Sequence, residues 1–158
     1  MSAFDIRLAG PADMAEVMTG LRALAADLGD PFNANEATVS DALFGPRAFG
    51  FALLATSRGG LALCNPILST FQGATIVYVS DLWVAASARG MGLGRALLAA
   101  AAREGQRRWQ ANALRLTVYE DNPQAMTFYQ RLGFVLRDQD RITALTGARL
   151  AELRGETA

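Results

Sequence analysis

Hydrophobic residues recur along this chain with two periods, one typical of helices and the other of strands. Between Pro11 and Gly29 apolar residues repeat every three or four positions, which predicts an amphipathic helix that ends at Gly29. The alternation of Leu114, Leu116 and Val118 predicts a strand. Other apolar runs predict strands at 4–8, 49–55, 61–68, 75–84, 134–137 and 141–146.

Helix starts are marked by capping residues. Asn122 followed by Pro123 is a favourable start, because Asn caps the first N–H groups and Pro suits the first helical position. Asn35 is a candidate cap of the same kind. Further helices are predicted over 35–43, 92–110 and 123–132, with a last helical turn around Leu150 and Leu153.

The composition is that of one globular domain. The chain has 158 residues, enough for a single core, and 51% of them are hydrophobic. Fifteen basic and fifteen acidic residues give a net charge of zero, which argues against a general nucleic-acid-binding surface. Cys64 is the only cysteine, so it cannot form an internal disulfide. We expect a cytoplasmic protein that is not inserted in a membrane, because no signal peptide or membrane-length apolar run is visible.

Three glycines at alternate positions provide the strongest functional signal. Gly90, Gly92 and Gly94 follow an apolar strand and open a helix, with Arg89 and Arg95 on either side. Glycine lets a ligand approach the backbone closely, and the first N–H groups of a helix favour an anion. The two guanidinium groups add positive charge with a geometry suited to phosphate oxygens. The segment therefore predicts a pyrophosphate-binding loop, although a glycine-rich turn without a ligand remains an alternative.

Two common phosphate-binding loops do not fit. A P-loop ends in Gly-Lys-Ser/Thr, whereas Arg95 and Ala96 follow Gly94 here, and the chain has no lysine. A dinucleotide-binding turn has the spacing Gly-x-Gly-x-x-Gly near the start of its domain. The spacing found here is Gly90-x-Gly92-x-Gly94 and comes late in the chain.

A second motif narrows the assignment. It consists of a strand at 114–118, then Asn122, a short helix, and the pattern Tyr129-x-x-x-Gly133-Phe134. This order resembles the second half of the GNAT acetyltransferase core. The glycine loop is similar to the Arg/Gln-x-x-Gly-x-Gly/Ala coenzyme A loop of the same superfamily, and the resemblance covers most of the chain.

The resemblance implies an α/β (α+β) fold and an activity. The fold would be one domain over 1–158, with helices flanking a mixed, mostly antiparallel sheet splayed between its fourth and fifth strands. The activity would be acetyl transfer from acetyl-CoA to a primary amine by direct attack in a ternary complex, without a metal. A homodimer and a small-molecule amine substrate are also implied.

The resemblance also implies the coenzyme-binding residues. The strand end before the loop would bind the pantetheine arm through its backbone, the loop would bind the pyrophosphate, and two residues of the second motif would contribute. These residues are Leu82, Trp83, Val84, Arg89, Gly90, Met91, Gly92, Leu93, Gly94, Arg95, Asn122 and Tyr129.

Two residues are candidates for catalysis. The resemblance places Tyr129 as the general acid that protonates the departing thiolate; an ordinary packed tyrosine is the alternative. The chain has no histidine, so a carboxylate acting through water is the best remaining base. Asp81, at the bend of the central strand, is the first candidate for that base or for binding the amine, and its alternative is a structural role. Glu120 and Asp121 are further candidates.

The amine that would accept the acetyl group is less well defined by the sequence than the coenzyme. Residues 78–84 resemble the Tyr-x-Glu-Asp-Leu/Phe-Phe-Val of the diamine (spermidine/spermine) acetyltransferase branch, but Ser80 stands where that branch has a second acidic residue. A smaller amine, a lysine-like amino acid or an antibiotic amine therefore remains open. Two rival hypotheses are a non-catalytic acyl-CoA sensor on the same fold and a protein N-acetyltransferase.

Overall fold

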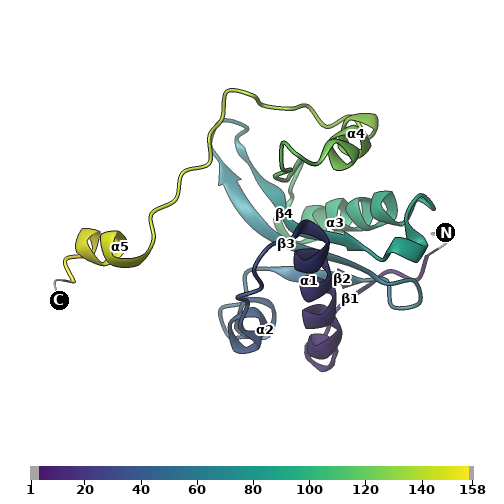
Figure 1. Ribbon diagram of the computed structural model, residues 1–158, viewed down its shortest axis with the longest axis horizontal. Helices are drawn as coiled ribbons and strands as arrows, with labels where there is room; N and C mark the ends of the chain where they lie inside the picture. Colours follow the sequence, from purple (N-terminus) through teal and green to yellow (C-terminus); the bar gives the residue numbers. More distant parts are fainter. Residues whose placement is uncertain (1–3, 157–158) are drawn as a thin grey trace. The chain divides into compact units, whose positions relative to one another are not determined.

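A computed structural model describes residues 4–156, and its contacts divide the chain into two compact units, Met1–Tyr119 and Glu120–Ala158. The first unit is a five-stranded sheet with helices (Figure 1). Its strands are β1 (Arg7–Leu8), β2 (Phe51–Leu54), β3 (Gly60–Ser69), β4 (Ala74–Val84) and β5 (Leu114–Arg115). Its helices are η1 (Pro11–Asp13), α1 (Met14–Leu28), α2 (Glu36–Phe44), η2 (Ala86–Ala88) and α3 (Leu93–Trp109).

The sheet confirms the predicted fold class. Its strands follow in chain order, and each neighbouring pair is antiparallel except β4 and β5, which are parallel. β4 pairs with β5 only at Val77 and Tyr78. Beyond Tyr78, as far as Val84, β4 keeps its ladder with β3 but has no strand partner on the β5 side among the described residues. The sheet therefore opens between strands four and five, as predicted.

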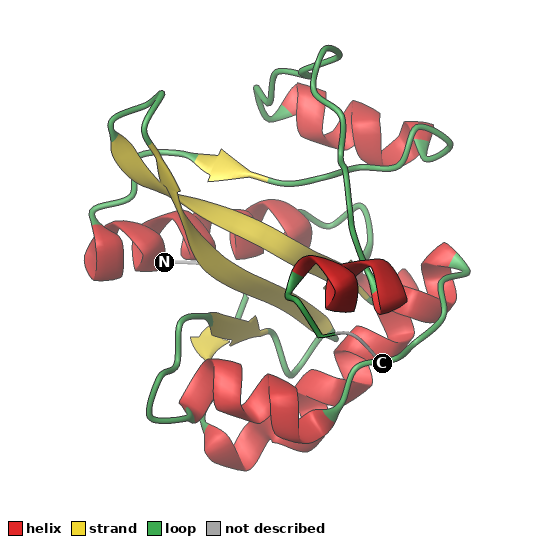
Figure 2. Cartoon of the chain, turned by 90° about the vertical axis from the view of Figure 1, so that its left-hand side faces the viewer, coloured by secondary structure: helices red, strands yellow, loops and turns green. Residues whose placement is uncertain are grey.

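Helices cover both faces of this sheet (Figure 2). α1 and α2 pack on one face through a cluster of buried apolar side chains that includes Met18, Leu21 and Leu61. α3 packs on the other face, where its Gly105 lies against Val77 of β4. The helix periodicity in the sequence thus corresponds to real packing faces.

A β-bulge in β4 changes which face its side chains occupy. Leu63 of β3 pairs with Asp81 and Cys64 pairs with Val79, so Ser80 is an extra residue in β4. The Ser80 hydroxyl donates to the Leu63 carbonyl at 3.2 Å. Without the bulge, strict alternation would put residue 81 on the α3 face with residue 77. With it, Asp81 lies on the α1 face.

Gly105 provides a test of this packing. A Cβ at this position would lie 2.0 Å from Val77 Cγ2, and the buried, β-branched Val77 cannot easily rotate away. Gly105→Ala should therefore lower the free energy of unfolding by about 2 kcal/mol, despite the helix propensity that alanine adds. Unfolding in urea would measure this loss of stability. In a Val77→Ala background the same substitution should be neutral or stabilising, and an equal loss in both backgrounds would contradict the packing.

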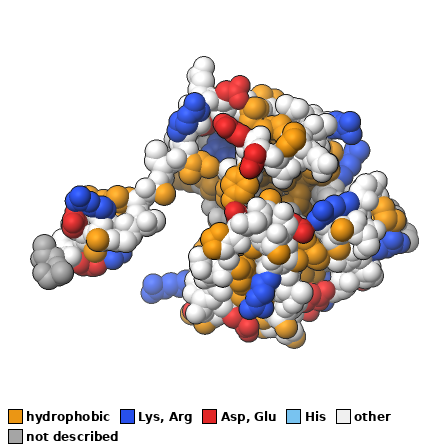
Figure 3. Space-filling view, viewed as in Figure 1, with side chains coloured by type: hydrophobic (Ala, Val, Ile, Leu, Met, Phe, Trp, Pro, Cys, Tyr) orange, Lys and Arg blue, Asp and Glu red, His pale blue; other side chains and the backbone are white. Residues whose placement is uncertain are grey.

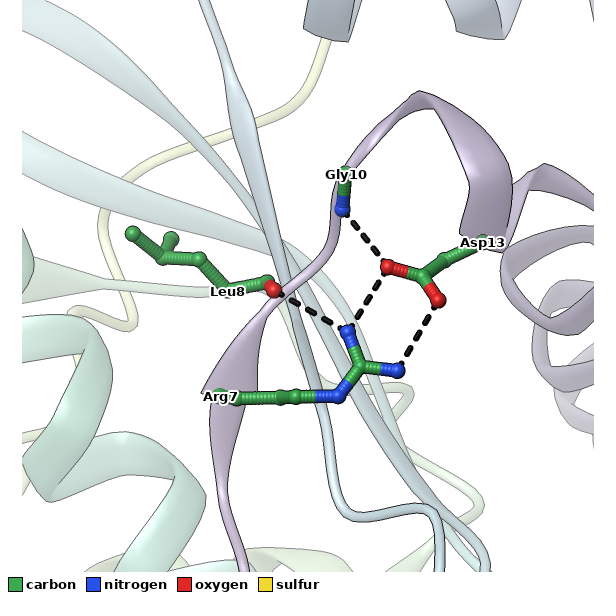
Figure 4. Close-up of polar contacts among 4 residues, drawn as sticks. All are labelled: Arg7, Leu8, Gly10 and Asp13. Carbon is green, nitrogen blue, oxygen red and sulfur yellow. Dashed lines mark hydrogen bonds and ion pairs between the residues drawn. The ribbon is translucent and has the colours of Figure 1, made fainter.

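The start of α1 is tied to β1 by a cluster of polar contacts (Figure 4). The Arg7 guanidinium donates to both carboxylate oxygens of Asp13, at 2.7 and 2.9 Å, and the Gly10 N–H donates to the same carboxylate at 2.7 Å. The Arg7 pair, followed by the Gly10 hydrogen bond, lowers the pKa of Asp13 to about 2. We assign this cluster a structural role, because its donors and acceptors are hydrogen-bonded to one another.

The second unit contains α4 (Pro123–Arg131) and α5 (Gly147–Leu153). Asn122 caps α4 as predicted, because its side-chain oxygen accepts the Ala125 N–H at 3.1 Å. The strands predicted at 134–137 and 141–146 are wrong, as the structure assigns no strand there. The apolar residues are present in the sequence, but a strand also needs a hydrogen-bonded neighbour. None pairs with these segments in the described chain, and Val135 is 86% exposed.

Candidate active site

The end of β4 leads directly into the glycine loop. The loop passes through η2 and Arg89 and reaches α3 at Leu93. Gly90 and Gly92 have φ values of +75° and +88°, which L side chains rarely adopt. A Cβ at either position would meet nothing within 4 Å. Backbone conformation, and not crowding, is therefore what requires glycine here, and the space above the loop is open.

The loop presents the N-terminus of a long helix. Gly92 is the N-cap of α3 and supplies no side-chain oxygen to the first N–H groups, and the first turn contains no acidic residue. Leu93 and Leu97 are buried and hold this end of α3 on the sheet. Arg95 is exposed in the same turn. A cation at this end of a helix is unfavourable by itself, so the arrangement favours an anionic ligand.

Arg89 is already paired, which the sequence did not indicate. Its guanidinium forms an ion pair with Asp27 near the end of α1, and its Nε donates to the Val84 carbonyl at 2.9 Å. Trp83 Nε1 donates to the same Asp27 oxygen at 3.1 Å. Part of the positive charge expected from Arg89 is therefore neutralised, although the guanidinium still has free N–H groups.

A different arginine lies beside the loop. Arg58, in the turn between β2 and β3, places Nη1 3.9 Å from the sulfur of Met91. The sequence carried no signal for this neighbour, because 33 residues separate the two and only the sheet brings them together.

Asp81 lines a cavity of about 260 Å³ in the first unit. The walls come from α1, from the segment between α1 and α2, and from α2, β3 and β4, and they are mostly apolar. The lining residues are Leu21, Leu24, Ala25, Leu28, Asp30, Pro31, Phe32, Asn33, Ala34, Val39, Leu63 and Asp81. Two carboxylates in an apolar cavity are a chemical signal for a cationic ligand.

The surroundings of Asp81 affect its protonation. Burial raises the pKa of Asp81, and a hydrogen bond from Ser80 opposes that rise. Asp30 is half-buried and accepts a hydrogen bond from the Tyr119 hydroxyl at 2.8 Å. Burial also raises the pKa of Cys64 to about 12, so this thiol is not a nucleophile at neutral pH.

Tyr129 belongs to the second unit. Its ring lies 5.1 Å from that of Phe128 and 5.5 Å from that of Phe134, centroid to centroid. Burial raises its pKa, so the hydroxyl keeps its proton through neutral pH. Glu120 and Asp121 are exposed in the same unit. The first unit brings together Asp81, the end of β4 and the glycine loop, whereas Asn122 and Tyr129 are positioned by α4.

Comparison with known families agrees with this fold. The model described as the acetyltransferase (GNAT) family matches residues 21–134. The chain belongs to this family and is an acetyltransferase. Membership of the family implies acetyl-CoA as the cosubstrate. The comparison with curated proteins gave no match.

Similar solved structures come from proteins of several kinds. A tetramutant of the BH1408 protein from Bacillus halodurans is 29% identical, with a TM-score of 0.65 over 90% of this chain and 99% of that one. An aminoglycoside acetyltransferase from an uncultured soil metagenomic sample, solved with sisomicin, is 13% identical, with a TM-score of 0.73 over 90% and 95%. Ribosomal-protein-alanine N-acetyltransferase from Brucella melitensis biovar Abortus 2308 is 19% identical, with a TM-score of 0.68 over 90% and 99%. The last two likenesses show the fold alone, and none distinguishes the diamine branch.

Two further features bear on partners. Within residues 4–156, no helix is long and apolar enough to cross a membrane. Acidic and basic side chains are interspersed on the face seen in Figure 3, in keeping with the zero net charge.

Proposed function

We propose that this protein is an N-acetyltransferase that moves the acetyl group of acetyl-CoA to a primary amine of a small molecule. The observation that carries the proposal is the half-buried carboxylate of Asp81 in an apolar cavity, on the strand that continues into the glycine loop. The strand thus links a cation-binding environment to an anion-binding one within one unit.

The coenzyme would bind along the end of β4 and the loop. On the β5 side, residues 82–84 have no strand partner, and their backbone groups other than the Val84 carbonyl, which accepts from Arg89, would pair with the two amides of pantetheine. The N–H groups from Arg89 to Arg95, with the start of α3, would hold the pyrophosphate. Asn122 and Tyr129 would complete the site from the second motif. Acetyl-CoA supplies the activated thioester, and no metal is needed for the residue roles proposed here.

The acceptor would place its ammonium group at Asp81. The cavity volume of about 260 Å³ is below the roughly 300–1,000 Å³ usual for drug-sized ligands. A small linear amine, polyamine-like or lysine-like, therefore fits better than a large one such as the sisomicin bound by the metagenomic acetyltransferase. Asp30 would accept a second cationic or hydrogen-bonding group of the same molecule.

The residues of this chain would then supply proton transfer and charge stabilisation. Asp81 would take the ammonium proton through a water and release the free amine for attack on the thioester carbonyl. A backbone N–H near Val84 would stabilise the oxyanion. Tyr129 would donate its proton to the departing thiolate, for which its raised pKa keeps it protonated. We also retain the homodimer as a prediction.

A turnover assay tests the proposal. Purified protein is mixed with acetyl-CoA and each of a panel of monoamines, diamines, amino acids, aminoglycosides and N-terminal peptides, and release of free CoA is measured. Turnover of small amines supports the proposal, and turnover of peptides alone would favour a protein N-acetyltransferase. Coenzyme binding without turnover of any amine would favour the acyl-CoA sensor.

The Asp81→Asn substitution tests the acceptor site. It keeps the size of the side chain and removes its charge, so KM for amines should rise about tenfold. The pH–rate profile should shift upward, because the amine must then lose its proton without a carboxylate. In the wild type, activity should fall as the pH drops through the raised pKa of Asp81. Acetyl-CoA affinity should be unchanged.

Thermal stability separates this role from a structural one. A carboxyl whose pKa is raised by folding contributes stability at low pH, and that contribution is lost as the pH rises through its folded pKa. Asp81→Asn should therefore be at least as stable as the wild type at pH 7. Asp41→Asn, at an exposed position of α2, is the matched control. A lower Tm with an unchanged KM would make Asp81 a structural residue of the bulge.

A further inference from the structure

The arginines of the first unit fall into two groups. Arg107 and Arg108 share Glu104, and Arg89 pairs with Asp27. Arg7 likewise pairs with Asp13. No carboxylate of residues 4–156 lies within ion-pair distance of the second group, which consists of Arg22, Arg47, Arg58, Arg95, Arg103 and Arg115. Arg58 and Arg95 are the members of this group that concern us. Both of them belong to the surroundings of the glycine loop.

The β2–β3 turn that carries Arg58 is fixed to the start of this loop. The Gly59 carbonyl accepts the Ala85 N–H at 2.9 Å, directly after β4 ends. Gly59 has a φ of +69°, and a Cβ there would lie 2.9 Å from the Ala85 Cβ, so the turn and the strand end are in close contact. The position of Arg58 is therefore set by backbone contacts and not only by its flexible side chain.

The contact of Arg58 with Met91 does not satisfy its charge. A thioether sulfur is a weak acceptor, and the 3.9 Å separation leaves the other guanidinium N–H groups available. Met91 lies between Gly90 and Gly92, the two positions of positive φ in the loop. The guanidinium thus contacts a side chain of the loop whose N–H groups would bind the pyrophosphate in the proposed function.

We propose that Arg58 binds the pyrophosphate of the coenzyme from the β2–β3 turn. This assignment rests on the proposed coenzyme site and adds a residue that the loop motif does not contain. It accounts for two observations together: Arg89 is partly neutralised by Asp27, and a second, unpaired guanidinium stands next to Met91. Two phosphate groups carry more charge than Arg95 and the helix terminus alone would balance.

The test measures binding of three ligands to Arg58→Gln by titration calorimetry. The ligands are CoA, 3′-dephospho-CoA, which keeps the pyrophosphate, and pantetheine, which lacks it. We expect about tenfold weaker binding of both CoA and 3′-dephospho-CoA, with no change for pantetheine. Arg47→Gln is the control, because Arg47 is an exposed arginine in the connection between α2 and β2. Circular dichroism and the Tm confirm that each variant is folded.

The other outcomes are decisive as well. Unchanged affinity for CoA would overturn the assignment and make Arg58 a solvated surface residue. Weaker binding of CoA alone would also overturn it, because Arg58 would then contact the 3′-phosphate. If the wild type itself failed to bind CoA, the proposed function would fail, which is a result distinct from an insensitive Arg58 variant.

Discussion

Tyr129→Phe should lower kcat by about 10²–10⁴-fold, the usual contribution of a general acid. The substitution removes only the hydroxyl, and the ring would keep its contacts with Phe128 and Phe134. Coenzyme affinity should therefore change little. The wild type should lose activity at alkaline pH as the tyrosine ionises, at a pKa above its ordinary value because of burial.

The pH profile distinguishes this role from a packing role. In Tyr129→Phe the alkaline decline due to the tyrosine should disappear along with most of the activity. Stopped-flow or steady-state kinetics over pH 6–11, with calorimetry for coenzyme affinity, would measure both. A variant that turns over at the wild-type rate at every pH would remove Tyr129 from the chemistry, leaving water or the substrate as the proton donor.

Gly92→Asp should weaken coenzyme binding by about 100-fold or more. A carboxylate about 5 Å from a phosphate charge costs about 3 kcal/mol at an effective dielectric constant of about 20, which is about 100-fold in affinity. The added carboxylate would also compete for the first N–H groups of α3, for which Gly92 is the N-cap.

Gly92→Asn is the matched control for this substitution. Asn and Asp have nearly the same size, and both tolerate a positive φ better than other side chains. The two variants therefore share the strain of the +88° backbone and differ in charge. Calorimetric titration with CoA should show a far greater loss for Asp than for Asn. Equal affinities in two folded variants would show that the loop does not bind the phosphates.

Features of this protein that depend on neighbouring residues could be predicted from the sequence. The Asn122 cap depends on residues two or three positions apart, and the glycine loop depends on which residues accept a positive φ. The same holds for α1 and α3, whose apolar stripes match their buried faces. The order of elements and the resemblance to the family also predicted the sheet that opens between strands four and five, which the structure confirms. The binding of a coenzyme by the glycine loop stays a prediction.

Features that depend on contacts between residues far apart in the sequence were determined by the tertiary structure. The segments 134–137 and 141–146 have a strand pattern but no ladder, because pairing is a property of two segments and not of one. The bulge at Ser80 moves Asp81 to the α1 face, which alternation alone does not predict. Asp27 neutralises part of Arg89, and Arg58 comes to the loop through a hairpin 33 residues away. The sequence therefore determined the family and the conformation of the glycine loop, whereas long-range packing determined which charges surround that loop.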